Sequence, residues 1–386
     1  MSNWPHFADD EIQAVVDVLK SGKVNQWTGT KVREFEQTFA ESHGCQYGIA
    51  LANGTLALEL ALYALGIGPG DDVITTAKTF VASASCVVMR GARPIIADVD
   101  LDSQNITAET IEAAMTPNTK AIIAVHMAGW PCDMDAIMAL AKKHNLYVIE
   151  DCAQAHGARY KGRPVGSLGH VAAFSFCQDK IMTTGGEGGM LTTNDEALWK
   201  KAWAYKDHGK DYDLCFNTEH PPGFRWLHTD FGTNWRMTEM QAAIGLKQLE
   251  KLPAWHEARK RNAAILSEAL ARLPFLRVAL PSDEIEHAWY KYYVFVILEK
   301  LPKGISRDDL INALAVAGLP AMTGGCSEIY HETCFKKYGY GPKADLPNAR
   351  KLTETSMLFL IHPTLSADEM EKMADNICQI LLQCAG

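Results

Sequence analysis

The sequence lacks long hydrophobic runs, an excess of basic residues and closely spaced cysteine pairs, and each absence argues against a class of protein. No apolar segment approaches the roughly 20 residues that a membrane-spanning helix needs, so we expect no membrane partner. The net charge of −9 argues against a nucleic-acid partner, because such proteins need a basic surface to displace counterions. The amino terminus also lacks the basic and then hydrophobic regions of a secretory signal.

The ten cysteines are scattered along the chain and never form a Cys-x-x-Cys pair. In a chain of this length without a secretory signal, we expect reduced and mostly buried thiols in a cytoplasmic protein. Ligand-like spacing is missing as well, so the sequence predicts no metal site.

With 386 residues, of which 47% are apolar and 22% charged, the chain is long enough for two globular domains. After two amphipathic helices, strand-like and helical segments alternate. The helical segments are 8–20, 32–43, 56–65, 81–90, 108–115 and 134–144, and the strand-like segments are 47–51, 72–76, 94–98, 119–126 and 146–150. This alternation predicts an α/β protein with a mostly parallel sheet covered by helices on both faces.

The pattern changes in the second half of the chain. Residues 238–256 have helical spacing, and Pro253 is expected to kink or end that helix before a second one over 259–272. A β-rich run at 290–298 and helices at 307–317 and 367–383 follow. We therefore predict a large domain over residues 1–255 and a smaller α+β domain over residues 256–386.

A lysine and an aspartate carry the first indication of chemistry. Lys180 closes the run Ser175-Phe176-Cys177-Gln178-Asp179-Lys180 and is followed by the glycine-rich stretch 185–189, while Asp151 follows an apolar strand. Taken singly, they are ordinarily a solvated loop lysine and a helix-capping acid. Together they match the needs of pyridoxal phosphate. The amine condenses with the cofactor aldehyde, and the carboxylate keeps a proton on the pyridine nitrogen, which makes the ring an electron sink.

Other candidate residues lie just past apolar strands, where parallel sheets bind their ligands. Gly54 and Thr55 open a helix whose free backbone N–H groups can bind a phosphate, although Thr55 can equally be a simple helix cap. Ser175 can donate its hydroxyl to a phosphate oxygen, and Gln154 can bond the ring hydroxyl. Phe80 can lie over the pyridine ring, although a core aromatic is its ordinary interpretation.

A series of motifs extends through nearly the whole chain. They are Asn53-Gly54-Thr55-Leu56-Ala57-Leu58, Thr79-Phe80-Val81-Ala82-Ser83, Glu150-Asp151-Cys152-Ala153-Gln154-Ala155-His156-Gly157, Ser175-Phe176 with Lys180 and Glu187-Gly188-Gly189, and the segment 232–243 that begins Gly232-Thr233-Asn234. In this order they resemble the DegT/DnrJ/EryC1/StrS sugar aminotransferases. The resemblance implies the aspartate aminotransferase-like fold type I, pyridoxal 5'-phosphate as cofactor (pyridoxamine 5'-phosphate during turnover) and a homodimer with shared active sites.

The resemblance also implies catalytic roles. Lys180 forms the covalent linkage with the cofactor and shuttles a proton, and Asp151 pairs with the pyridinium. Phe80 stacks on the ring, and Gln154 lies near the ring hydroxyl. Relatives with a histidine in place of this lysine catalyse dehydration, so Lys180 favours transamination, in which the freed amine moves a proton.

The phosphate contacts are implied in the same way. Gly54, Thr55 and Ser175 hold the phosphate of their own subunit, and Asn234 reaches the phosphate of the partner subunit. One departure from the family lies close by, since Gly185-Gly186 gives two glycines before Glu-Gly-Gly where one is usual. The extra residue is expected to reshape the loop beside the cofactor.

The substrate pocket is less defined, because residues 323–330 lack the Pro-Leu-His-like pattern common in the family. Trp27 and Tyr330 are candidate contacts for the sugar or base, with packing as the alternative. Candidates for binding a pyrophosphate are Arg236, Lys78 and Arg225, and each also fits an ordinary surface or ion-pair role.

The resemblance implies that an amino acid, most often L-glutamate, donates an amino group to a nucleotide-linked keto sugar. We expect a 4-keto-6-deoxyhexose, used for a surface polysaccharide such as O-antigen. A 3-keto sugar is the closest alternative, and a pyridoxal-phosphate-dependent dehydratase is a second. A non-catalytic regulator with the same fold is least favoured, because the lysine and the aspartate are intact and no basic DNA-reading helix is present.

Overall fold

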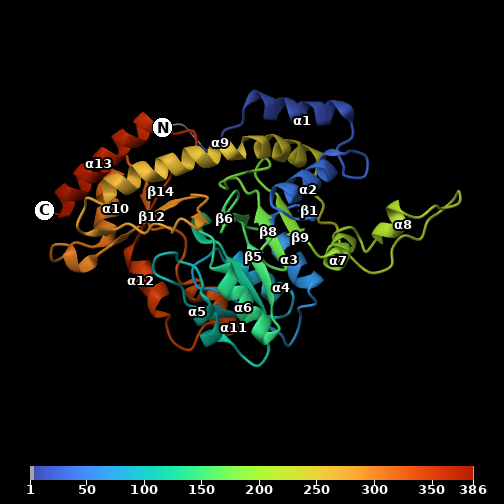
Figure 1. The fold of residues 1–386 in the computed structure, drawn as a ribbon, viewed down its shortest axis with the longest axis horizontal. Helices are drawn as coiled ribbons and strands as arrows, with labels where there is room; N and C mark the ends of the chain where they lie inside the picture. The colour runs from blue at the N-terminus through green and yellow to red at the C-terminus, as the bar shows by residue number, and fades with distance from the viewer. Residues whose placement is uncertain (1–3, 386) are drawn as a thin grey trace.

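A seven-stranded sheet lies at the centre of the computed structural model, which describes residues 4–385 (Figure 1). The strand order is β1-β9-β8-β5-β4-β2-β3. Its strands are β1 (Tyr47–Leu51), β2 (Asp72–Thr76), β3 (Arg93–Ala97), β4 (Thr119–Val125), β5 (Tyr147–Asp151), β8 (Val171–Ser175) and β9 (Gly189–Thr193). β9 pairs antiparallel with β1 and β8, and the remaining pairs are parallel, so the predicted mostly parallel sheet is confirmed.

Helices cover both faces of this sheet because side chains alternate along each strand. In β4, Ile122 and Ala124 join one core with α2, α5, α6 and α9, while Ala121, Ile123 and Val125 join a second core with α3, α4 and α7. These helices and their neighbours are α1 (Asp9–Ser21), α2 (Lys31–Ser42), α3 (Gly54–Ala64), α4 (Ala82–Met89), α5 (Ala108–Ala114), α6 (Met134–His144), α7 (Glu196–Lys206) and α8 (Tyr212–Phe216).

The long helix α9 (Glu239–Leu270) connects the large sheet to the rest of the chain. In Figure 1 it runs along one side of the molecule from α13 to α1 and α2, and it packs against all three. The expected end of the helix at Pro253 is wrong, since one helix continues through it to Leu270. An interior proline costs about 3 kcal/mol, and contacts with three helices offset that cost. The predicted domain boundary at residue 256 falls inside this helix.

A second sheet, of order β10-β12-β14-β13, forms the carboxy-terminal part with its own core. Its strands are β10 (Leu276–Arg277), β12 (Tyr292–Val296), β13 (Ala321–Met322) and β14 (Ser356–Phe359), and helices α10 (Arg307–Val316) and α13 (Ala367–Ala385) share its core. Helices α11 (Thr333–Tyr338) and α12 (Pro347–Thr355) bury side chains in the core of the large sheet. A small third sheet joins β6 (Arg159–Tyr160), β7 (Arg163–Pro164) and β11 (Ile285–Glu286), and short 3-10 turns are η1 (Met127–Gly129), η2 (Leu298–Lys300) and η3 (Ile329–His331). Between residues 4 and 385, no helix is both long and apolar enough to cross a membrane.

Gly245 of α9 provides a test of how closely the helices pack. A Cβ atom at this position would lie 2.6 Å from the ring of the fully buried Phe35 in α2. Alanine is the better helix former by about 1 kcal/mol, but we expect overpacking to dominate and Gly245→Ala to lower the free energy of unfolding by about 1–3 kcal/mol. Urea denaturation measures this, with the exposed Lys260→Ala on the same helix as a near-neutral control. A stabilised Gly245→Ala variant would show that the helices are not in tight contact.

Candidate active site

Asp151 is a buried carboxylate at the carboxyl end of β5, with 5% of its surface exposed. Ser83 Oγ donates a hydrogen bond of 2.8 Å to Oδ2, and the backbone N–H of Ala153 donates one of 3.1 Å to Oδ1. Burial raises the pKa of Asp151, and the Ser83 hydrogen bond, the Ala153 N–H and the Lys180 charge only partly offset it. Within residues 4–385, no lysine or arginine forms an ion pair with this carboxylate. A protonated pyridine nitrogen would supply the missing cation, so the site fits pyridoxal phosphate.

Phe80 lies close to the same carboxylate, since the backbone N–H of Ser83 bonds the Phe80 carbonyl at 3.2 Å. The side chain of Phe80 is 71% exposed, so its interpretation as a core aromatic is wrong. An exposed aromatic face beside a buried carboxylate suits stacking on a flat heterocycle.

The residues expected to hold a phosphate lie together at the amino end of α3. Asn53 caps this helix by accepting a hydrogen bond of 2.9 Å from the Leu56 N–H, and the N–H groups of its first turn are positioned for an anion. A Cβ at Gly54 would lie 2.6 Å from the Cβ of Ser175, so this close approach requires glycine. Ser175 Oγ accepts from the Cys177 N–H at 3.3 Å and keeps its own hydrogen to donate. Thr55 is exposed at the same turn.

Lys180 lies on the loop after β8, with 16% of its side chain exposed. Its amine nitrogen Nζ is 3.9 Å from Asp179 Oδ1 and 5.1 Å from the ring centre of Tyr290. Trp4 Nε1 donates a hydrogen bond of 3.0 Å to the Lys180 carbonyl. On the Asp151 side, Gln154 uses Oε1 to accept the Ala128 N–H at 2.9 Å. The loop lysine is therefore restrained through both its backbone and its neighbouring residues.

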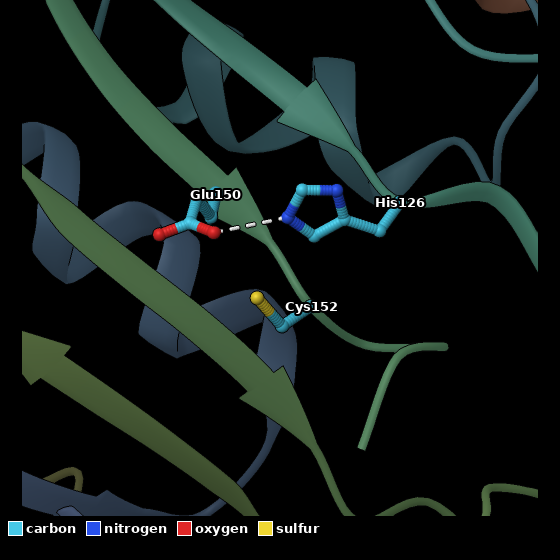
Figure 2. Close-up of side chains that lie close together, drawn as sticks. All are labelled: His126, Glu150 and Cys152. Carbon is cyan, nitrogen blue, oxygen red and sulfur yellow. Dashed lines mark hydrogen bonds and ion pairs between the residues drawn. The ribbon is translucent and has the colours of Figure 1, made fainter. Parts of the chain in front are cut away.

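Beside Asp151, the adjacent Glu150 lies close to His126 and Cys152, as Figure 2 shows, and one ligand atom from each of the three lies within 4.8 Å of the others. His126 Nε2 lies 3.1 Å from Glu150 Oε2, while His126 Nδ1 accepts the Cys132 N–H at 3.0 Å. The Glu150 carboxylate also accepts backbone N–H groups from the turn 166–169, at 2.8–3.0 Å. These bonds occupy the ligand atoms of His126 and Glu150, so the cluster holds the turn in place and is poorly suited to bind a metal.

The basic candidates for a pyrophosphate have different environments. Arg236 forms an ion pair of 2.8 Å with the buried Asp207, as its ordinary interpretation predicts. The expectation that Lys78 is a surface or ion-paired residue is wrong: it is fully buried and donates to Ser356 Oγ at 3.0 Å. Burial lowers its pKa to about 7. Only Arg225 among the three is solvent-exposed.

The aromatic candidates also differ. Trp27 is 36% exposed and stacks on Phe216 with ring centres 5.7 Å apart, while Lys210 Nζ lies 4.1 Å from the Trp27 ring centre. Tyr330 is 4% exposed and donates its hydroxyl to Glu328 Oε1 at 2.7 Å. Trp27 thus offers an accessible aromatic edge, whereas packing accounts for Tyr330.

Asn234 is exposed, and its segment runs beside the end of β1, where the Ala52 N–H bonds the Trp235 carbonyl at 3.0 Å. Its Oδ1 is 3.4 Å from the Arg236 N–H. An exposed amide of this kind is free to turn towards a second subunit, and its cross-subunit role stays a prediction.

The mostly parallel sheet, the covering helices and the strand-end site define the aspartate aminotransferase-like fold type I, and the protein is a pyridoxal-phosphate-dependent sugar aminotransferase. The chain belongs to the DegT/DnrJ/EryC1/StrS aminotransferase family, whose model matches residues 5–378.

Relatives support this assignment over the full length of the chain. The spore coat polysaccharide biosynthesis protein SpsC of Bacillus subtilis (strain 168) is 36% identical over 386 residues, covering 98% of this chain and 96% of SpsC. The X-ray structure of the aminotransferase from Psychrobacter cryohalolentis is 53% identical, with a TM-score of 0.98 and full coverage of both chains. The PLP form of the putative sugar aminotransferase Spr1654 from Streptococcus pneumoniae is 26% identical, with a TM-score of 0.87 over 99% of this chain and 98% of that one.

Sequence reasoning missed several residues of this site. Ser83 carried a usable signal, because it lies three positions after Phe80 at the start of a helix and therefore on a neighbouring face. No sequence signal indicates Trp4, Asp179 or Tyr290. The contacts of these residues around Lys180 join segments more than 100 positions apart or depend on the direction of a side chain.

Replacing Glu150 tests the turn behind the site. We expect Glu150→Gln to lower the free energy of unfolding at pH 7 by about 2–3 kcal/mol, because its amide group would face backbone N–H donors inside the protein. Burial alone would raise the pKa of Glu150, but the His126 hydrogen bond and the backbone donors outweigh it and leave the pKa below the ordinary 4.5. The stabilisation is therefore complete above pH 4.5 and is lost as the pH falls through the lower folded value.

Urea denaturation at several pH values measures this effect, and the difference between wild type and Glu150→Gln is expected to narrow below pH 4.5. Glu112→Gln is a matched control, because that glutamate is 54% exposed and paired with Lys143. A gap that stays constant into strong acid would contradict the role assigned to the carboxylate.

Proposed function

We propose that the protein transfers the amino group of L-glutamate to a nucleotide-linked 4-keto-6-deoxyhexose, for the biosynthesis of a surface polysaccharide of the O-antigen kind. The observation that carries this proposal is that the chain has both a loop lysine, Lys180, and a buried carboxylate, Asp151, with which no lysine or arginine of residues 4–385 forms an ion pair. The similarity to a spore coat polysaccharide biosynthesis protein supports a polysaccharide pathway. A 3-keto sugar is the second candidate acceptor, since the loop 323–330 departs from the common family pattern.

The proposed catalytic roles are those that the family resemblance implies, and the local environments support them. Lys180 would hold the cofactor covalently, and its amine is the base that would move a proton at the substrate carbon. Asp151 would hold the pyridine nitrogen in its protonated form, and Ser83 Oγ keeps this carboxylate oriented. When bound, the cofactor would supply an electron sink for the substrate carbanion. Gly54, Thr55 and Ser175 would bind its phosphate, Phe80 would cover its ring and Gln154 would lie near its hydroxyl.

A homodimer with shared active sites is part of the proposal. The segment that follows α8 projects away from the sheet, as Figure 1 shows at its right edge. This arm carries Phe224, Trp226 and Phe231, which are 79%, 82% and 93% exposed. Exposed aromatics gathered on one segment are typical of a surface that binds another protein. Asn234 lies just beyond the arm and would reach the phosphate of the partner subunit. We also propose a cytoplasmic location.

The substrate contacts follow from exposure. Trp27 presents an aromatic edge for a sugar or base, and Arg225 on the arm is accessible to a pyrophosphate. Arg236 would have to leave Asp207 to bind a phosphate, and Tyr330 would contact the sugar only if its loop moved. Both are part of the proposed pocket on these terms.

A panel of keto sugar nucleotides tests the function directly. Purified protein is incubated with glutamate and each sugar, and the product is identified by mass spectrometry and NMR. We expect a 4-amino sugar, formed only when glutamate is present. A 3-amino product would transfer the assignment to the 3-keto class, and turnover without glutamate would indicate a dehydratase. A protein that never binds pyridoxal phosphate would support a regulator.

Lys180→Ala is expected to abolish transamination and the visible absorbance of the covalently bound cofactor, because no other amine replaces it. Lys247→Ala, on a partly exposed lysine paired with Glu250, is the control and should retain both. The assays are turnover with the best sugar of the panel and the absorption spectrum. Transamination that survives in Lys180→Ala would refute the assignment.

A further inference from the structure

Tyr290 lies between the two loops that carry cofactor residues, although it belongs to the carboxy-terminal part of the chain, just before β12. Its backbone N–H donates to the Ala128 carbonyl at 3.0 Å. The Ala128 N–H in turn donates to Gln154 Oε1 at 2.9 Å. Ala128 has a positive φ of 57°, so its backbone groups are held in an orientation that non-glycine residues seldom adopt. Through this short chain of bonds, the backbone of Tyr290 is linked to Gln154.

The side chain of Tyr290 reaches the other loop. Its hydroxyl donates to Asp179 Oδ2, on the residue directly before Lys180. Lys291 Nζ also approaches that oxygen, at 3.3 Å, and Lys180 Nζ lies 3.9 Å from Asp179 Oδ1. The amine of Lys180 is 5.1 Å from the Tyr290 ring centre, within range of a cation–π contact. One side chain therefore contacts both the lysine and the residue that precedes it.

Helix α9 holds this arrangement in place. The guanidinium of Arg259, a residue 1% exposed, donates through Nη1 to the carbonyls of Trp289 and Tyr290 at 3.3 and 3.2 Å. The same guanidinium lies 5.2 Å from the Trp4 ring, and Trp4 Nε1 bonds the Lys180 carbonyl at 3.0 Å. The backbone of Lys180 and the backbone of Tyr290 thus share one buried anchor.

Tyr290 is 7% exposed and belongs to the apolar core of the large sheet. Ordinary packing between the two parts of the chain would require only its ring. It would not require a hydroxyl aimed at the carboxylate next to the reactive lysine. Asp179 is 55% exposed on its side chain, so water could satisfy it without the tyrosine. The hydrogen bond between the Tyr290 hydroxyl and the Asp179 carboxylate therefore fixes the position of the lysine loop and is not needed to bury either group.

We propose that Tyr290 is a positioning residue that fixes the Lys180 loop relative to the Gln154 loop, through Asp179 on one side and Ala128 on the other. It sets how closely the lysine amine approaches the cofactor aldehyde carbon, with which the amine forms a carbon–nitrogen bond as one water is lost. This inference rests on the proposed role of Lys180. Misplacement by about 1 Å can cost on the order of a hundredfold in rate, so a loosened loop has a measurable effect.

The test uses Tyr290→Phe, which keeps the ring and removes the hydroxyl. The full-length chain, freed of cofactor, is mixed with pyridoxal phosphate, and the covalent linkage is fixed with borohydride at successive times and counted by mass spectrometry. We expect covalent capture about tenfold slower than in wild type, with the same thermal midpoint as Tyr292→Phe. Tyr292 lies two residues after Tyr290, on β12, and this control variant loses a hydroxyl that is bonded to Ser267 at 3.0 Å. It should capture the cofactor at the wild-type rate.

Asp179→Asn provides a second, half-exposed variant that does not depend on the folding of Tyr290→Phe. It should slow capture similarly, and the double variant should be no slower than the worse single variant, because both remove one shared bond. Three outcomes would each overturn the inference. Tyr290→Phe could capture the cofactor within twofold of the wild-type rate, Tyr292→Phe could be slowed as much as Tyr290→Phe, or the effects of the two single variants could multiply in the double variant. If borohydride fixes the wild-type cofactor at a residue other than Lys180, the proposed function fails instead, so the two failures are distinguishable.

Discussion

The burial of two adjacent carboxylates at the end of β5 is the constraint on which the site depends. Glu150 is hydrogen-bonded to His126 and accepts hydrogen bonds from several backbone N–H groups. These bonds compensate for the desolvation of its carboxylate and hold the turn 166–169. Asp151 receives one hydroxyl and one N–H, and its charge is left without a protein cation in the described chain. Because successive residues of a strand point to opposite faces, one acid stabilises the sheet, and its neighbour is the one that we propose to bind the cofactor.

Rigid elements of both parts of the chain surround this carboxylate. The amino end of α3 and the close approach of Gly54 to Ser175 form the side on which we propose that the phosphate binds. On the other side, α9 extends from the large sheet to the small one, and Arg259 anchors the segment that contacts the lysine loop. A site assembled in this way requires both parts to fold around a common helix. Because α9 continues through Pro253, one helix contributes side chains to the core of the large sheet and to that of the small one.

The residues proposed to bind the cofactor lie on strand ends and helix termini with many hydrogen bonds. The arm after α8 is mostly exposed, whereas the loop 323–330 is exposed at Thr323, Gly325 and Cys326 and buried from Ser327 to Tyr330. Surface loops can change without disturbing the sheet. We propose that the choice of sugar is made by loops of this kind, and the sugar of this member stays a proposal.

The sequence by itself determined the alternation of strands and helices, the family, the cofactor and most of the residues proposed to bind it, because strand periodicity and strand-end motifs are local along the chain. It did not determine that α9 would pass through Pro253, that Lys78 would be buried or that Phe80 would be exposed. Those outcomes depend on what packs against each residue. The contacts of Tyr290 and Trp4 with the lysine loop arise only in the tertiary structure, since folding alone brings such distant segments together and aims their side chains.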